Sequence, residues 1–252
     1  MNALAREISS GIADCELTHL DRAPIDLDRA RRQHAVYIEC LERLGCGVRL
    51  LPADSTLPDC VFIEDTAVVV PELAVLSRPG AESRRGELPV VEAALQAVRP
   101  VQRIEAPGTL DGGDVLRIDR LIWVGCGNRT NAEGGRQLAD HLTPMGYEVR
   151  LVSQHGCLHF KSGCSQAGAE QVLLNPEWID PGLFPGLEVI EVDPTEPFAG
   201  NVLKVGDTLV VDGRFERTVE RLDTLGLPLE VLDNAELARA EGGLTCGSIL
   251  LD

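Results

Sequence analysis

Several short polar segments interrupt otherwise apolar stretches, and two of them supply a nucleophile and a base. Cys246 lies between glycines in GGLTCGS and offers a thiol, whose ionised form is a strong nucleophile. His159 lies in LHFKS and offers an imidazole that can accept or donate a proton near neutral pH. A cysteine and a histidine far apart in sequence, with an acid elsewhere, form a known thiol-enzyme pattern.

Three further segments supply acids and an arginine. PDCVFIED contains Asp59, Glu64 and Asp65, and carboxylates in such an apolar setting are costly to bury unless they are paired. LDGGDV places Asp111 before two glycines, whose backbone freedom lets neighbouring side chains converge. NRTN contains Arg129, which could hold a carboxylate through two N–H groups.

Each of these segments also has a simpler explanation when it is taken alone. Asp59 could lie on the polar face of a strand, the DGGD segment could be a hairpin turn, and Thr130 or Asn128 could cap a helix. His159 and Cys246 could be core residues. Taken together, the segments supply a thiol, a base, an orienting acid, further acids and arginines, which favours nucleophilic catalysis at a cationic carbon.

The elements that position these residues repeat a pattern. Apolar spacing predicts helices at residues 25–45, 83–98, 130–142, 217–225 and 236–240. Strands are predicted at residues 48–51, 61–70, 74–77, 101–104, 115–118, 121–124, 148–152, 171–174, 188–192, 202–205, 208–211, 229–232 and 244–250. A strand–strand–helix–strand rhythm recurs without a linker, which predicts one α/β domain over residues 1–252. The rhythm fits a modular ring or a mixed α+β sheet, and it does not fit a doubly wound parallel sheet.

Composition and charge narrow the classes of partner. The chain has 252 residues, 23 Lys and Arg against 40 Asp and Glu, and a net charge of −17. This charge disfavours nucleic acid and anionic membranes as partners. It would keep the protein soluble and could attract a small cationic substrate.

The eight cysteines and the lengths of the apolar segments indicate in which cellular compartment the protein functions. None of the cysteines forms a CxxC or zinc-binding spacing, so we expect reduced thiols, mostly in the core, and neither a metal site nor a cofactor. The first twenty residues lack the pattern of a secretory signal, and no apolar stretch has the length of a membrane span. We therefore expect a cytoplasmic protein; the oligomeric state stays open, a homodimer included.

Six motifs, in order, resemble those of the dimethylarginine dimethylaminohydrolase family. The motifs are VFIEDTAVV, SRPGAESRR, LDGGDVL, NRTNAEG, LHFKSGCS and GGLTCGSILL, and the resemblance covers most of the chain. It implies a five-bladed, pseudo-symmetric β/α propeller of ββαβ modules around a central pocket, the pentein fold. It also implies hydrolysis of Nω-methylated arginines to citrulline and methylamine or dimethylamine.

The resemblance implies a role for each catalytic residue. Cys246 would attack the guanidinium carbon and form a covalent thiouronium intermediate. His159 would protonate the leaving amine and then deprotonate water, and Asp111 would orient His159. Asp59 and Asp65 would hold the guanidinium nitrogens.

The amino-acid end of the substrate is assigned in the same way. Arg84 and Arg129 would hold the α-carboxylate, Glu64 would take part in binding the amino-acid end, and residues 14–19 match the mobile lid loop of the family. Deiminases of the wider superfamily carry a glutamate where this chain has Asp111. They also carry an aspartate where this chain has Lys161, and its loss suits a guanidine whose far nitrogen is methylated.

Other functions remain open at this point. Arginine deiminase, agmatine deiminase and amidinotransferase share the superfamily, although the predicted carboxylate clamp argues against agmatine. A non-catalytic propeller that serves as a binding module shares the architecture, since a fold does not determine function.

Overall fold

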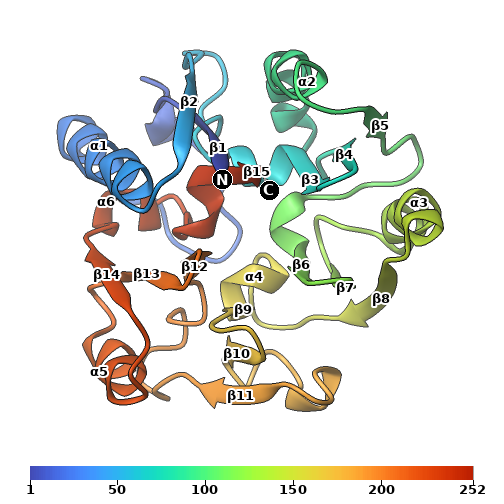
Figure 1. The fold of residues 1–252 in the computed structure, drawn as a ribbon. Helices are drawn as coiled ribbons and strands as arrows, with labels where there is room; N and C mark the ends of the chain where they lie inside the picture. The colour runs from blue at the N-terminus through green and yellow to red at the C-terminus, as the bar shows by residue number, and fades with distance from the viewer. Residues whose placement is uncertain (252) are drawn as a thin grey trace.

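Five three-stranded sheets surround a common centre in the computed structural model, which describes residues 1–251 (Figure 1). In each sheet the middle strand is antiparallel to the strand nearest the centre and parallel to the outermost strand. A helical segment connects the middle strand to the outermost one. These are ββαβ modules, so the expected five-bladed propeller is confirmed.

Four modules are continuous in sequence. The first contains β3 (Ala67–Val70), β4 (Leu73–Leu76), α2 (Leu88–Gln96) and β5 (Val101–Arg103), and the second contains β6 (Val115–Ile118), β7 (Leu121–Cys126), α3 (Ala132–Leu142) and β8 (Glu148–Ser153). The third contains β9 (Cys164–Gln166), β10 (Gln171–Leu174), the 3-10 helix η6 (Pro181–Leu183) and β11 (Glu188–Glu191). The fourth contains β12 (Leu203–Val205), β13 (Thr208–Asp212), α5 (Glu216–Thr224) and β14 (Leu229–Leu232). The short helix α6 (Ala235–Ala238) follows the last of them.

The fifth module joins the two ends of the chain. It contains β1 (Asn2–Arg6), α1 (Leu27–Arg43) and β2 (Gly47–Leu51), and its innermost strand is the C-terminal β15 (Ser248–Leu251). Strands β15 and β1 are antiparallel, with Ala3 opposite Leu250. Both ends therefore meet near the centre of the ring, as Figure 1 shows, and their pairing closes it.

The apolar core lies largely between neighbouring modules. Val68 and Val75, from β3 and β4, pack with Val115, Ile122 and Leu138 of the next module. Because side chains from two modules share one cluster, each module buries apolar surface only in the presence of its neighbour.

A tight helical turn precedes four of the five innermost strands. These turns are η2 (Ile63–Thr66), η4 (Gly112–Asp114), α4 (Phe160–Gly163) and η7 (Thr245–Gly247). The strands predicted at 61–70 and 244–250 therefore begin later than predicted. In the first case the N–H of Phe62 donates to the carbonyl oxygen of Asp59 at 2.9 Å, which is a turn hydrogen bond rather than a sheet one.

Two of the five predicted helices, at residues 83–98 and 130–142, also begin differently in the structure. Residues Glu82–Glu87 form a 3-10 helix, η3, so α2 begins at Leu88 and not at residue 83, and the hydroxyl of Ser83 donates to the side chain of Glu16. Helix α3 is capped by Asn131, which accepts the N–H of Gly134 at 2.8 Å, so neither Thr130 nor Asn128 is the cap. Strands β1 and β9 and helix α4 were not expected from the sequence.

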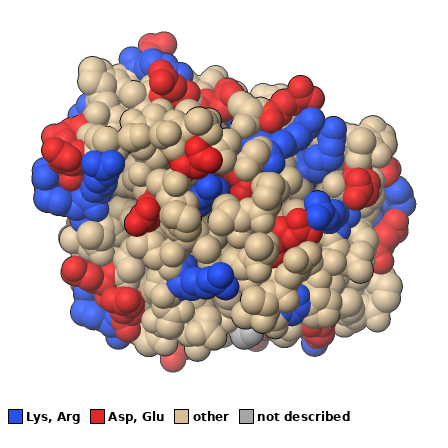
Figure 2. Space-filling view, turned by 90° about the horizontal axis from the view of Figure 1, so that it is seen from above, with Lys and Arg blue, Asp and Glu red and all other residues tan. Residues whose placement is uncertain are grey.

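The helices and the charges on one face can be compared with what a membrane or a nucleic-acid partner would require. Within residues 1–251, no helix combines the length and the apolar character needed to cross a membrane. Acidic and basic side chains are intermixed on the face shown in Figure 2, which has no continuous basic stripe. A nucleic-acid partner would require such a stripe, so this face does not suit one.

Candidate active site

The turns before the innermost strands bring four predicted site residues to the centre of the ring. Asp65 lies in η2, Asp111 directly precedes η4, His159 directly precedes α4, and Cys246 lies in η7. The turns occupy equivalent positions in successive modules, so residues far apart in sequence meet around one axis.

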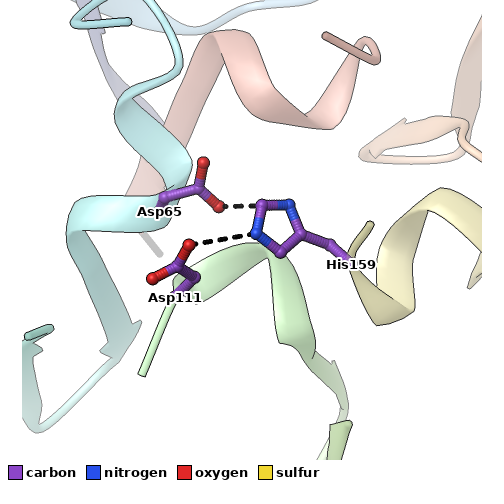
Figure 3. Close-up of side chains that lie close together, drawn as sticks. All are labelled: Asp65, Asp111 and His159. Carbon is purple, nitrogen blue, oxygen red and sulfur yellow. Dashed lines mark hydrogen bonds and ion pairs between the residues drawn. The ribbon is translucent and has the colours of Figure 1, made fainter. Parts of the chain in front are cut away.

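Asp65, Asp111 and His159 form a buried cluster (Figure 3). The imidazole Nε2 lies 3.1 Å from Oδ2 of Asp111, and Nδ1 lies 3.7 Å from Oδ1 of Asp65. Each ring nitrogen therefore faces a carboxylate, an arrangement that stabilises the charged imidazolium.

The protonation states follow from this geometry. Burial disfavours a charged imidazole, but the carboxylates of Asp65, Asp114 and Asp111 outweigh it and raise the pKa of His159 to about 9. Burial likewise opposes ionisation of Asp65, yet His159 and Arg84 lower the pKa of that carboxyl to about 2. At neutral pH the pair is ionic, with the proton on His159.

Glycines allow this close approach. A Cβ atom on Gly113 would lie 2.6 Å from Oδ1 of Asp65 and 2.8 Å from Nδ1 of His159, and one on Gly112 would lie 2.1 Å from the carbonyl oxygen of Glu64. The N–H of Gly113 also donates to Asp65 at 3.0 Å. The two glycines are therefore required for space. Neither has a positive φ, so the special backbone path expected for them from the sequence is not what the turn needs.

Asp114 is a buried residue of the site that the sequence reasoning did not select. Its Oδ1 accepts the N–H of Phe160 at 3.0 Å and the amide of Gln154 at 2.8 Å, and its Oδ2 accepts the hydroxyl of Thr130 at 2.6 Å. Asp114 thereby fixes the segment that begins at His159. The feature of the sequence that could have identified Asp114 is its position as the second acid of the DGGD segment.

Cys246 shares a small cavity with His159. The cavity, of about 20 Å³, is also lined by the predicted residues Asp59, Asp65, Arg84 and Arg129. Burial and the negative charges of Glu64 and Asp65 raise the pKa of the Cys246 thiol above its ordinary value. The thiol is therefore protonated at neutral pH in the ligand-free protein.

Glu64 lies away from this cavity, contrary to its expected contact with the amino-acid end of a substrate. Its Oε1 accepts from Nζ of Lys161 at 2.6 Å and its Oε2 accepts from the hydroxyl of Thr245 at 2.7 Å. It lines instead a separate cavity together with both of these residues. Consecutive side chains of a 3-10 turn point in different directions, so Asp65 faces the site while Glu64 faces away from it.

Asn201, which the sequence did not single out, also supports the turn that contains Cys246. Its amide donates to the carbonyl oxygen of Lys161 at 2.8 Å and to the hydroxyl of Thr245 at 3.0 Å, and its Oδ1 accepts the N–H of Thr245. Thr245, the residue before Cys246, is thus held by hydrogen bonds with Asn201 and by the one that its hydroxyl donates to Glu64.

Arg84 is buried and largely occupied by neighbouring acids. Its Nε and Nη2 each donate to Glu87 at 2.9 Å, Nη1 donates to Asp65 at 2.5 Å, and Nη2 also donates to the carbonyl oxygen of Phe62. Four of its five N–H groups therefore orient protein atoms, which leaves at most one for a substrate carboxylate. Glu87 carries no signal in the sequence.

Arg129 and Asp59 contact residues 16–20, which overlap the lid loop expected at residues 14–19 and of which Glu16 lines the cavity. We call residues 16–20 the lid segment. Nη2 of Arg129 donates to the hydroxyl of Thr18 at 3.2 Å, and the carboxylate of Asp59 accepts the N–H of Glu16 at 3.2 Å. Both side chains are thus engaged by the lid segment.

The same buried cluster has the composition of a metal site. One ligand atom from each of Asp65, Asp111 and His159 lies within 4.8 Å of the others. A protonated imidazole cannot ligate a metal, and Arg84 already balances the charge of Asp65. The cluster therefore fits acid–base chemistry better than metal binding.

The fold and site together define a class: a propeller enzyme of the pentein fold whose central cavity holds a thiol, an imidazolium and several carboxylates. Solved structures agree with this class. The dimethylarginine dimethylaminohydrolase of Pseudomonas aeruginosa, a cysteine-to-serine variant complexed with citrulline, matches with a TM-score of 0.94, 32% identity and 98% coverage of both chains. The N-terminal domain of a cyanobacterial arginine dihydrolase matches in fold, with a TM-score of 0.89 and 20% identity, over 98% of this chain and 97% of that one.

Sequence comparison identifies the family. The chain is 38% identical to the Streptomyces coelicolor N(G),N(G)-dimethylarginine dimethylaminohydrolase, over 99% of this chain and 96% of that protein. It is 33% identical to the Pseudomonas aeruginosa enzyme of the same name, over 97% of this chain and 95% of that protein. No family model matches the chain. The chain belongs to the dimethylarginine dimethylaminohydrolase family.

Proposed function

We propose that this protein hydrolyses Nω,Nω-dimethyl-L-arginine and Nω-methyl-L-arginine to L-citrulline, with release of dimethylamine or methylamine. The observation that carries the proposal is the shared cavity, in which Cys246 and His159 lie beside the carboxylates of Asp59 and Asp65. The two relatives named dimethylarginine dimethylaminohydrolase, similar over nearly their whole length, support the same reaction.

The charge of the substrate prepares the nucleophile. Burial and the negative field of the nearby acids together raise the pKa of Cys246. A guanidinium held by Asp59 and Asp65 offsets that field, so substrate binding promotes loss of the thiol proton to solvent. His159 is already protonated and does not accept that proton. The reactive ion pair of thiolate and imidazolium thus forms only in the complex.

The first half of the reaction releases the amine. The Cys246 thiolate attacks the guanidinium carbon and forms a C–S bond. His159 then donates its proton to the methylated nitrogen, the C–N bond breaks, and the neutral amine leaves a covalent thiouronium. Asp111, at 3.1 Å from Nε2, orients the imidazole for this transfer.

The second half consumes water. The neutral His159 accepts a proton from a water molecule, and the resulting hydroxide attacks the same carbon. The C–S bond then breaks and the hydroxyl proton of the adduct is lost to solvent, which regenerates the Cys246 thiolate and releases neutral citrulline. The protonated His159 is restored for the next cycle.

We assign binding of the amino-acid end of the substrate to Arg129. When the hydroxyl of Thr18 is displaced, the guanidinium of Arg129 can bind the substrate α-carboxylate, and Arg84 can add its one remaining N–H group. Glu64 has no part in this contact, since it faces Lys161.

An arginine deiminase is the nearest alternative. Deiminases carry a second acid where this chain has Lys161, and here Nζ of Lys161 is paired with Glu64. The far guanidine nitrogen thus meets one acid fewer, which favours a methylated nitrogen with fewer N–H groups. A non-catalytic binding module would have no use for a thiol, an imidazolium and carboxylates in one cavity.

One assay separates these activities. We expect citrulline from dimethylarginine and monomethylarginine, little from arginine, and no carbamoylputrescine from agmatine. Rapid turnover of arginine with none of the methylated substrates would establish a deiminase instead. No turnover of any guanidine by folded protein would favour a binding module.

Location and assembly are further parts of the proposal. All eight cysteines are free thiols and six are buried, which suits a reducing compartment, so we place the protein in the cytoplasm. A homodimer stays a prediction, which sedimentation analysis would check.

A further inference from the structure

One carboxylate holds three consecutive backbone N–H groups of the lid segment. The side chain of Glu241 accepts from Thr18 at 3.1 Å and from His19 and Leu20 at 2.6 Å each. Successive N–H groups that point to one side form a concave anion site, which Glu241 fills from a distant part of the chain. These are charge-assisted hydrogen bonds, the stronger kind.

The lid segment must move for a substrate to enter. The cavity beneath it, about 20 Å³, has room for roughly one water molecule, far less than an arginine derivative needs. Glu16 of the lid segment and Glu241, which directly precedes Gly242, both line this cavity. The contact between the lid segment and Glu241 therefore lies beside the cavity that contains Cys246.

Besides the hydroxyl of Ser83, which donates to the side chain of Glu16, the lid segment has two kinds of anchor. Asp59, which accepts the N–H of Glu16, is proposed to bind the substrate guanidinium, and Arg129, which contacts Thr18, is proposed to bind the carboxylate. A bound substrate competes with the lid for both of these side chains. Glu241 has no assigned contact with the substrate, so it can hold the lid backbone when the other two are occupied.

The position of Glu241 links the lid to the nucleophile. It directly precedes Gly242 and Gly243, and the N–H of Gly243 lies 3.4 Å from Sγ of Cys246. Glu241 has a left-handed backbone, with φ of 60°, which residues other than glycine rarely adopt. Such a conformation persists only where the surroundings hold it, and the three lid hydrogen bonds are one such constraint.

We propose that Glu241 is a positioning residue that keeps the lid segment closed over bound substrate. It acts through the backbone of Thr18, His19 and Leu20 and does not touch the reacting atoms. The effect on catalysis rests on the proposed function, whereas the effect on the lid itself does not.

The test compares two variants of the full-length protein with a matched control. Glu241→Gln keeps the size and backbone conformation but removes the charge, and Glu241→Gly removes the side chain and relieves the backbone strain. Asp119→Asn is the control, because exposed Asp119 is the other non-glycine residue with positive φ among residues 1–251 and lies in the turn between β6 and β7.

Amide hydrogen exchange of the ligand-free protein reads the lid directly. We expect the amides of residues 18–20 to exchange roughly tenfold faster or more in Glu241→Gln, and faster still in Glu241→Gly, because charge-assisted hydrogen bonds are lost. Asp119→Asn should match the unchanged protein. Unchanged exchange in both Glu241 variants would overturn the proposal.

Alkylation of Cys246, followed by peptide mass spectrometry, separates lid opening from an electrostatic effect. Opening should raise the rate at every pH without shifting the apparent pKa of the thiol, while Cys126, the other partly exposed thiol, keeps its rate. A shifted pKa with unchanged exchange would show that Glu241 acts on Cys246 through charge, and would contradict the proposal.

Steady-state kinetics then test the effect on bound substrate. We expect KM for dimethylarginine to rise by roughly tenfold in Glu241→Gln while kcat changes less. A fall in kcat at constant KM would instead assign Glu241 to the geometry of the Cys246 turn. If no methylated arginine is turned over, the exchange and alkylation results still decide the lid proposal.

Discussion

Cys246 and His159 are both protonated at neutral pH, so this site differs from one with a preformed thiolate–imidazolium pair. Burial and nearby acids keep the thiol protonated, while three carboxylates keep the imidazole charged. Burial is the larger cause of the shift in the thiol pKa, and negative charge adds to it, whereas for the imidazole negative charge outweighs burial. A cationic guanidinium reduces that negative charge, so the substrate itself completes the reactive state.

At the residue scale, the first prediction concerns the nucleophile. Cys246→Ser should lower kcat by at least about a thousandfold, because a serine hydroxyl at this position has no base to activate it. The fold and the binding of dimethylarginine, measured by calorimetry, should change little. Cys126→Ser is the control and should keep full activity; a Cys246→Ser rate near that of the control would remove Cys246 from the mechanism.

A second prediction at this scale concerns pH. His159 must be protonated to donate to the leaving amine, and its pKa is about 9, so kcat/KM should decline as the pH rises through that value. Asp111→Asn removes one of the charges that raise this pKa, so the alkaline decline should move to lower pH by about one unit.

The measurement is a pH–rate profile for each protein, with Asp140→Asn on the exposed face of α3 as the control. The control should reproduce the unchanged profile. An alkaline decline that stays in place in Asp111→Asn would mean that another group, not His159, loses its proton there.

At the scale of elements, the turns before the innermost strands decide what the centre of the ring contains. Each turn is three or four residues long and has one polar site residue within it, as with Asp65 in η2 and Cys246 in η7, or directly before it, as with His159 before α4. Because the turn is tight, the neighbouring side chain is directed elsewhere. Glu64 beside Asp65 is the example, and it supports the Cys246 turn through Thr245.

Gly113 provides the prediction at this scale. In Gly113→Ala the new Cβ would overlap both Asp65 and His159, and neither buried side chain can move without losing its partners. We expect activity to fall by roughly a hundredfold or more, and unfolding free energy to fall by about 1–3 kcal/mol. Activity and chemical denaturation measure the two effects.

The control for this variant is Gly146→Ala. Gly146 has a φ of 86°, and an added Cβ would meet no atom within 4 Å, so alanine there strains the backbone without touching the site. It should lose stability and keep kcat. If Gly113→Ala also keeps kcat, the close approach at Gly113 does not matter for catalysis.

At the scale of the whole molecule, the ring makes the five modules depend on one another. Apolar clusters join β3 and β4 to the next module, and β15 at one end of the chain pairs with β1 at the other. No module within residues 1–251 is a separate unit by its packing. The expected single domain over residues 1–252 is consistent with this arrangement and stays a prediction for folding.

Calorimetry tests that prediction. Thermal unfolding should give one cooperative transition, in which the calorimetric and van't Hoff enthalpies agree, because loss of one module exposes the core of its two neighbours. A substrate analogue should shift the whole transition to higher temperature. Two separate transitions, of which only one responds to the analogue, would show independent units.

The sequence alone determined the types of residue and the repeating rhythm of elements. Local apolar spacing predicted the helices and most strands within a few residues, since those depend on short-range periodicity. The six motifs indicated the family and, with it, Cys246, His159, Asp65 and Asp111, all of which the structure brings to the centre of the ring.

Only the tertiary structure decided where individual side chains point and which distant groups meet. Nothing local distinguishes Glu64 from Asp65, yet one supports the nucleophile turn and the other faces His159. Likewise Glu241 has no sequence signal, because its partners are backbone N–H groups more than two hundred residues away. Such contacts depend on ring closure, a long-range property that spacing along the chain does not contain.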